Sequence, residues 1–114
     1  MIVKIQPSNI SGTLVAATSK SSMQRALAAA LLTNGETTIL NPGRSNDDKA
    51  AIEIITALGA DVVVRQEQVI VNSFGVFSRS SEINCGESGL AVRMFTPIIA
   101  LCHTEITING EGSL

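Results

Sequence analysis

The spacing of apolar residues along the chain switches between the period of a helix and that of a strand. Between Lys20 and Asn34, apolar residues recur at every third or fourth position, which places Met23, Leu27 and Leu31 on one helix face. Glycines after the periodic stretches, and Ser, Asn or Asp before them, mark the expected helix ends. These signals predict helices over residues 20–34, 46–59 and 88–102.

Between these helices, β-branched and other apolar residues alternate with polar ones or form short runs, as is typical of strands. Strands are predicted over residues 2–6, 12–17, 37–41, 62–64, 69–71 and 105–109. The strands within 62–71 flank a polar turn and form a hairpin. We expect them to share one sheet with 37–41 and 105–109, covered on one face by the three helices. The two N-terminal strands are expected to lack partners, and to hang loosely or pair with another copy.

An internal repeat relates residues 20–41 to residues 88–109 at an offset of 68. Each copy has a turn rich in Ser or Gly, a helix with an Arg in its first turns (Arg25 and Arg93), and a β-branched strand ending in Asn. This period is too long for a solenoid repeat and matches the length of a β-α-β-α-β-β unit. The predicted fold class is therefore α/β (α+β), with one such unit followed by the start of a second.

Composition and charge exclude several classes of function. Of 114 residues, 45% are hydrophobic and the formal net charge is −2, which excludes disorder and gives no basic stripe for nucleic acid. The longest apolar runs fall far short of the roughly 20 residues that span a bilayer. One His and two Cys do not supply a four-ligand zinc site. The low cysteine usage predicts reduced thiols in a cytoplasmic protein without a metal.

The segment Thr18–Arg25 has the chemistry of an anion site. Free N–H groups and hydroxyls at a helix start favour phosphate, and Ser21 and Arg25 share a face at a spacing of four residues. Lys20 supplies a point charge and Arg25 a bidentate fork, a pairing that suits ligands with both phosphate and carboxylate groups. On spacing alone, an ordinary serine N-cap with a solvated Lys and Arg explains the segment at least as well.

A second motif, Gly86-Glu87-Ser88-Gly89, precedes the third predicted helix. Gly89 would let a ligand approach the backbone closely, although a plain capping turn is the simpler explanation on local grounds. We expect Arg93 to be structural and to pair with a carboxylate, for which Asp47 and Asp48 are the candidates. Those two acids are otherwise expected to stabilise the start of the second helix.

In order and spacing, these motifs resemble the start of the 5-enolpyruvylshikimate-3-phosphate synthase family. The residues that carry the resemblance are Ser19–Ala26, Asn34–Thr37, Asp47-Asp48, Leu58–Ala60 and Gly86–Arg93. The resemblance extends over the whole chain, which corresponds to about the first quarter of such an enzyme. Related enolpyruvyl transferases that act on a UDP-sugar are a lesser fit, because in them the Lys is followed by Asn without a matching Arg.

The resemblance implies transfer of an enolpyruvyl group from phosphoenolpyruvate to the 5-hydroxyl of shikimate 3-phosphate in aromatic amino acid biosynthesis, without a metal or organic cofactor. It implies that Lys20 contacts both substrates, that Ser21 and Arg25 hold shikimate 3-phosphate, and that the Gly89 backbone meets phosphoenolpyruvate. No catalytic acid or base is expected within this chain, which should be inactive alone. Those groups are expected in a C-terminal portion of the same enzyme, the principal partner besides the phosphorylated substrates.

The resemblance also implies a fold of two domains. Residues 1–18 would belong with the other domain, and residues 19–114 would form part of the N-terminal enolpyruvyl transferase domain. Glu87 and Leu90 replace the usual Asn and Thr of the family, which leaves the contacts near Gly89 open. A self-sufficient anion-binding or interaction domain without catalysis remains the alternative, disfavoured by the low charge content and the unfinished second repeat.

Overall fold

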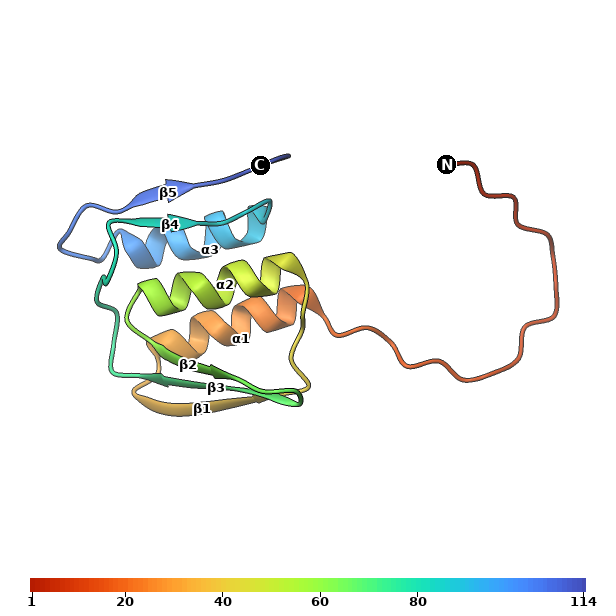
Figure 1. The fold of residues 1–114 in the computed structure, drawn as a ribbon, viewed down its shortest axis with the longest axis horizontal. Coiled ribbons are helices and arrows are strands. Elements are labelled where there is room, and N and C mark those ends of the chain that lie inside the picture. Colours follow the sequence, from red (N-terminus) through yellow and green to blue (C-terminus); the bar gives the residue numbers. More distant parts are fainter.

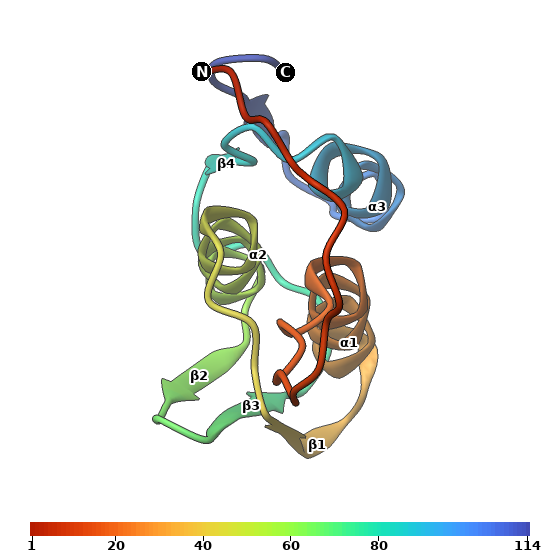
Figure 2. The same cartoon turned by 90° about the vertical axis from the view of Figure 1, so that its right-hand side faces the viewer.

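Two of three helices lie between two small sheets in the computed structural model, which describes residues 1–114, and the third lies beside the smaller sheet (Figure 1 and Figure 2). The helices are α1 (Lys20–Leu32), α2 (Asn46–Ala57) and α3 (Gly89–Ile99). One sheet contains β1 (Gly35–Leu40), β2 (Asp61–Val64) and β3 (Gln68–Ser73), and the other contains β4 (Glu82–Asn84) and β5 (Thr107–Asn109). Helices α1 and α2 cover one face of the larger sheet, while α3 and the smaller sheet lie on their far side.

The helix starts are set by local serine caps, and that of α2, Ser45, was not among the residues predicted from the sequence. Ser19 Oγ accepts a hydrogen bond from the Ser22 N–H at 3.3 Å, and Ser88 Oγ accepts one from the Ala91 N–H at 3.1 Å. At α2, Ser45 and Asp48 form a reciprocal capping box. The third helix is shorter than expected, because it ends at Ile99, two residues after Pro97. None of the three helices combines the length and the hydrophobicity that a membrane span requires.

The three-stranded sheet contains the predicted hairpin. Its order is β1-β3-β2 with both pairs antiparallel, so that Val71 lies opposite Thr37 on one side and Val62 on the other. These inward positions face α1 and α2. The hairpin and the strand near 37–41 are therefore confirmed as elements of one sheet.

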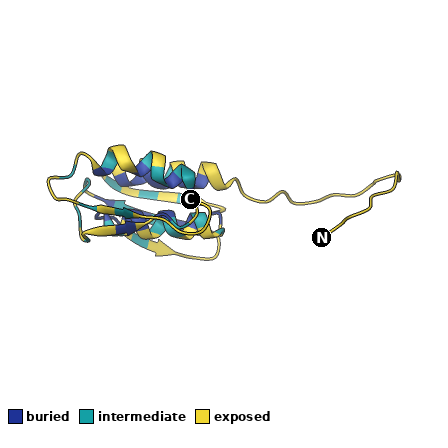
Figure 3. Ribbon diagram, turned by 90° about the horizontal axis from the view of Figure 1, so that it is seen from above, coloured by how far each residue is buried: buried dark blue, intermediate teal, exposed yellow.

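The core is aliphatic, and only one aromatic side chain is fully buried within it. The helix faces predicted to point inward do so, which gives the dark faces of the helices in Figure 3. Burial also raises the pKa of the Cys85 thiol, which therefore stays protonated at neutral pH. The buried apolar residues are Met23, Leu27, Ala28, Ala30, Leu31, Ala51, Ile54, Ile55, Leu58, Ala60, Val69, Val71, Ile83, Cys85, Ala91, Phe95 and Ile99.

The expected pairing of the last strand is wrong. Strand β5 does not join the sheet of residues 37–41 and 62–71, but pairs in parallel with β4 in a separate sheet, with Ile83 opposite Ile108. Strand β4 is not predicted from the sequence because it has only three residues and lies in a polar, serine-rich stretch. As a result, α1 and α2 separate two sheets, and the three helices do not cover one face of a single sheet.

The two N-terminal strands predicted over 2–6 and 12–17 are absent. Residues 1–19 form an arm without secondary structure that leaves the start of α1 and is exposed throughout (Figure 3). A strand is stabilised by hydrogen bonds to a neighbouring strand, and the arm has no such neighbour within this chain. The arm therefore has the alternating apolar pattern of a strand, but no other part of the chain covers its apolar side chains.

Candidate substrate-binding site

The N-terminal ends of all three helices gather at one end of the molecule, which faces the viewer in Figure 2. Two contacts join them. Lys20 Nζ at the start of α1 lies 2.8 Å from Asp47 Oδ2 in the first turn of α2. Ser88, the N-cap of α3, donates a hydrogen bond to Gln24 Oε1 of α1 at 3.0 Å. Because a helix N-terminus carries partial positive charge, this end of the molecule favours anions.

The predicted residues of α1 are all exposed at this end. Lys20, Ser21 and Arg25 lie in the first two turns of the helix, and Ser21 and Arg25 share a face. Arg25 has no carboxylate partner, since the two ion pairs of the structure are Lys20–Asp47 and Arg79–Asp61. The guanidinium of Arg25 is thus free to bind an external anion.

Asp47 fixes the position and charge of Lys20. The hydrogen bond from Lys20 to Asp47, together with the negative charge of Asp47, raises the pKa of the ammonium above its usual value of 10.5. The Lys20 side chain remains 54% exposed while that of Asp47 is 19% exposed, so the pair has one open side. Lys20 is therefore held at the mouth of the site as a permanent cation, with N–H donors left for a ligand.

We expect the Asp47→Asn variant to lower the pKa of Lys20, because both stabilising effects of the carboxylate are lost. In the native chain the folded-state pKa of Lys20 lies above its unfolded value. The pair therefore stabilises the fold below pH 10.5, and this contribution is lost as pH rises through the folded pKa. An NMR titration of the Lys20 side chain measures the change. Asp61→Asn, which removes the other ion pair, is the control and should leave the Lys20 curve in place; an unchanged curve in Asp47→Asn would contradict the assignment.

The fourth predicted residue, Gly89, is the first residue of α3 and is half-buried. A Cβ added to Gly89 would meet only Leu114 Cδ1 at 4.0 Å, so its backbone is open to an approaching ligand. The Glu87 side chain lies against Gly112, where an added Cβ would collide with it.

The expected pairing of Arg93 with Asp47 or Asp48 is wrong. Arg93 is exposed, and its Nε donates to the Gly89 carbonyl of its own helix at 3.0 Å. Both acids are engaged elsewhere, because Asp47 pairs with Lys20 and Asp48 belongs to the cap of α2. Arg93 is therefore an additional cation near the start of α3, without a carboxylate partner.

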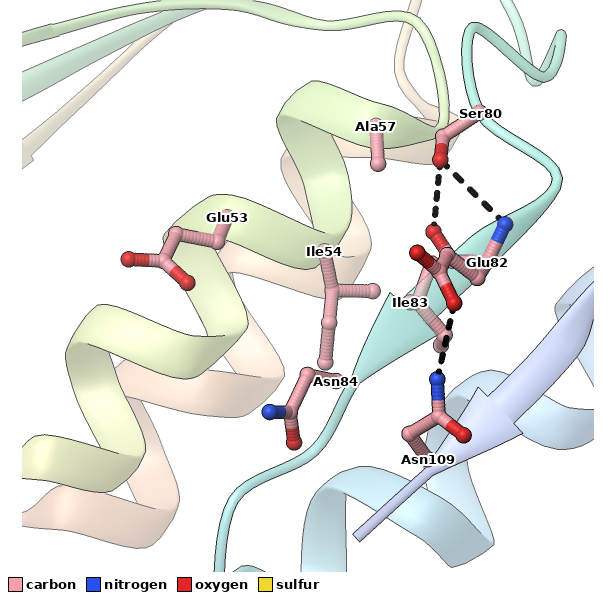
Figure 4. Close-up of a pocket in the computed structure, with 8 residues that line it drawn as sticks. All are labelled: Glu53, Ile54, Ala57, Ser80, Glu82, Ile83, Asn84 and Asn109. Carbon is pink, nitrogen blue, oxygen red and sulfur yellow. Dashed lines mark hydrogen bonds between the residues drawn. The ribbon is translucent and has the colours of Figure 1, made fainter.

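Two cavities near the helices differ in the charge of the residues that line them. A cavity of about 240 Å³ adjoins the start of α1, and Ser19 and Ser22 are among the residues that line it. None of Lys20, Ser21 and Arg25 lines this cavity. A cavity of about 360 Å³ lies between α2 and the smaller sheet (Figure 4). Its lining contains Glu53 and Glu82 and no cation, so it repels phosphate and carboxylate groups.

Comparison with known proteins shows which family the chain belongs to. The sequence model of the family described as EPSP synthase (3-phosphoshikimate 1-carboxyvinyltransferase) matches residues 4–114. The chain belongs to this family. The expected α+β fold of EPSP synthases is confirmed by an EPSP synthase structure from Acinetobacter baumannii, with a TM-score of 0.81 at 18% identity over 90% of this chain and 24% of that one.

The curated EPSP synthase relatives are named 3-phosphoshikimate 1-carboxyvinyltransferase. The protein of Clostridium perfringens (strain SM101 / Type A) is 33% identical over 98% of this chain and 27% of its own length. Those of Chlamydia caviae and Methanobrevibacter smithii are both 34% identical, over 97% and 94% of this chain and 25% of their own length. The chain therefore spans about a quarter of the length of the curated relatives that it matches.

The contacts of two residues near the site, Gln24 and Asp47, were not predicted from the sequence. Gln24 is only 1% exposed and joins α1 to the cap of α3, and Asp47 holds Lys20. The sequence did contain a signal for Gln24, because it lies three, four and seven residues before the apolar positions 27, 28 and 31 of the buried face. Asp47 carried no such signal, since its partner lies in another helix.

Proposed function

We propose that this chain forms part of a synthase that transfers the enolpyruvyl group of phosphoenolpyruvate to the 5-hydroxyl of shikimate 3-phosphate and releases phosphate. The observation that carries the proposal is the meeting of three helix N-termini with the family's Lys-Ser…Arg motif at one exposed end. Both substrates are small anions with phosphate and carboxylate groups, which match the donors gathered there.

The family motif implies a role for each of these residues, and their positions and chemistry support it. Lys20, held by Asp47 between α1 and α2, contacts both substrates as a point charge. Ser21 and Arg25, on one face of α1, hold shikimate 3-phosphate. The open backbone at Gly89 meets the smaller phosphoenolpyruvate. These groups bind and orient the substrates, and their fixed positive charges stabilise negative charge that develops during transfer.

Catalysis needs groups from outside these residues. Proton transfer requires an acid and a base positioned at the reacting carbon and hydroxyl, and we assign neither role to a residue of this chain. The exposed arm of residues 1–18 extends away from the body and, on this proposal, associates with the second domain of the synthase. The 114-residue chain alone is therefore expected to show no turnover.

A chimeric enzyme tests the function directly. Residues 1–114 replace the aligned quarter of the Clostridium perfringens relative, and phosphate release is measured with both substrates. We expect release that requires both, and none from the 114-residue chain alone. The same exchange with the Chlamydia caviae segment is the control. A chimera that folds but is inactive, while the control chimera works, would favour a non-catalytic anion-binding domain instead.

Substitution of Gly89 by Ala should affect the binding of the two substrates to different degrees. The added methyl has room in the fold, so the stability of the chain should change little. In the chimera, however, it intrudes where the backbone meets phosphoenolpyruvate, and crowding of a packed site costs about 1–3 kcal/mol. The KM for phosphoenolpyruvate should rise more than that for shikimate 3-phosphate. Equal changes in both constants would show that Gly89 serves only as a helix-start residue.

A further inference from the structure

A second cationic region lies at the start of α2, in a cavity that none of Lys20, Ser21, Arg25 and Gly89 lines. Arg44, Lys49 and Arg65 line one cavity of about 320 Å³, between the loop after β1, the first turn of α2 and the turn that joins β2 to β3. The chain has only eight Lys and Arg residues and a net charge of −2, so three cations at one cavity form a marked local excess of positive charge. Ile52 and Val64 supply an apolar part of the wall.

The charge of this cavity is not neutralised within the fold. No carboxylate lines it, and none of its three cations takes part in the two ion pairs of the structure. Of the acids close in sequence, Asp47 pairs with Lys20 and Asp48 caps α2. The exposed Glu53 and Glu67 lie outside the lining and form no ion pair with these cations. Like charges that converge without a counter-charge raise the local potential and attract an anion.

The walls of the cavity are held in place by hydrogen bonds. The Arg44 guanidinium donates to the Gln66 carbonyl, which ties the loop after β1 to the β2–β3 turn and leaves other N–H groups of Arg44 for a ligand. The same turn is fixed by bonds from the Asn41 N–H to the Glu67 carbonyl at 3.0 Å and from the Arg65 N–H to the Gln68 carbonyl at 2.8 Å. The three cations therefore stand on a rigid frame.

We propose that this basic cavity binds a small molecule that carries a phosphate group. Two guanidinium forks and one ammonium match the oxygens of a phosphate, and the apolar wall accepts the carbon part of the ligand. The cavity is separate from the proposed substrate site, because none of Lys20, Ser21 and Arg25 lines it. The inference therefore does not rest on the proposed enzymatic function.

The test uses the 15N-labelled 114-residue chain and inorganic phosphate at constant ionic strength, with chloride as the competing salt. Saturable shifts are expected for the amides of residues 44–49 and 65–67. The Lys49→Gln/Arg65→Gln double variant should bind phosphate there at least about tenfold more weakly, since charge-assisted hydrogen bonds are lost. Both substitutions are at exposed positions, and the spectrum itself reports whether the fold is retained.

Two control variants make the outcome specific. Lys4→Gln removes one cation from the exposed arm and should leave the shifts at the cavity unchanged. Arg25→Gln should also leave them unchanged, while it weakens any phosphate-induced shifts at residues 19–25. Shifts at the cavity that follow chloride as strongly as phosphate, or that persist at full affinity in the double variant, would overturn the proposal without touching the proposed function.

Discussion

Substitution of Arg25 by Ala in the chimeric enzyme is expected to weaken the binding of shikimate 3-phosphate by about 2–4 kcal/mol, because a charge-assisted fork to an anion is lost. Arg25 forms no ion pair in the structure, so the change costs little stability and its effect is seen in binding. Steady-state kinetics should show a large rise in the KM for shikimate 3-phosphate, and the melting temperature of the 114-residue chain should barely move.

Two further variants give this prediction its specificity. Arg25→Lys keeps the charge but removes the bidentate geometry, and we expect it to remain impaired. Arg79→Ala removes an arginine that pairs with Asp61 and lies outside the proposed site, so the KM should stay at the native value. Native kinetics in the Arg25→Ala enzyme would rule out the proposed role of this residue.

Local signals explain why most elements could be predicted from the sequence. The helices and the hairpin are encoded by periodicity, capping serines and turn residues that lie within a few positions of one another. The repeat was also informative, because Met23, Leu27 and Leu31 of α1 and Ala91, Phe95 and Ile99 of α3 are buried at the same offset of 68. The inward-facing strand residues Ile39 and Ile108 differ by 69, so the connection after α3 contains one more residue.

Long-range pairing explains what could not be predicted. The three residues of β4 become a strand only because β5, from beyond the third helix, lies beside them. The prediction of strands in the N-terminal arm is wrong for the opposite reason. The alternating pattern of the arm is strand-like, but no neighbour in this chain supplies hydrogen bonds. Strand formation depends on a partner that is often distant in sequence, and composition alone does not say whether the partner is present.

The same contrast applies to the site. Lys20, Ser21 and Arg25 could be proposed from the sequence because they share one local motif on one helix. The sequence did not show that Asp47 would hold Lys20, nor that Ser88 would bond to Gln24, because these contacts join separate helices. The mutual position of the two predicted binding segments, near residues 20–25 and at Gly89, therefore rests on a few contacts between helices.

Loss of the contact between Ser88 and Gln24 is expected to lower the stability of the fold strongly. Ser88→Ala removes the N-cap of α3, and it leaves the amide of Gln24 buried without any hydrogen-bond partner, since Gln24 Nε2 already lacks one. Cap loss costs about 1 kcal/mol and an unsatisfied buried polar group about 1–3 kcal/mol, so the free energy of unfolding should fall by about 2–4 kcal/mol. Urea unfolding of the 114-residue chain, followed by circular dichroism, measures this change.

Comparison variants separate the two contributions. Ser19→Ala removes the exposed cap of α1 alone and should cost only about 1 kcal/mol. In the double variant Gln24→Leu/Ser88→Ala the buried amide is gone, so the loss should shrink toward the value for the cap alone. The double variant would then be more stable than Ser88→Ala, although it contains one substitution more. If Ser88→Ala costs no more than Ser19→Ala, or if Gln24→Leu brings no recovery, the contact does not join the two binding segments energetically.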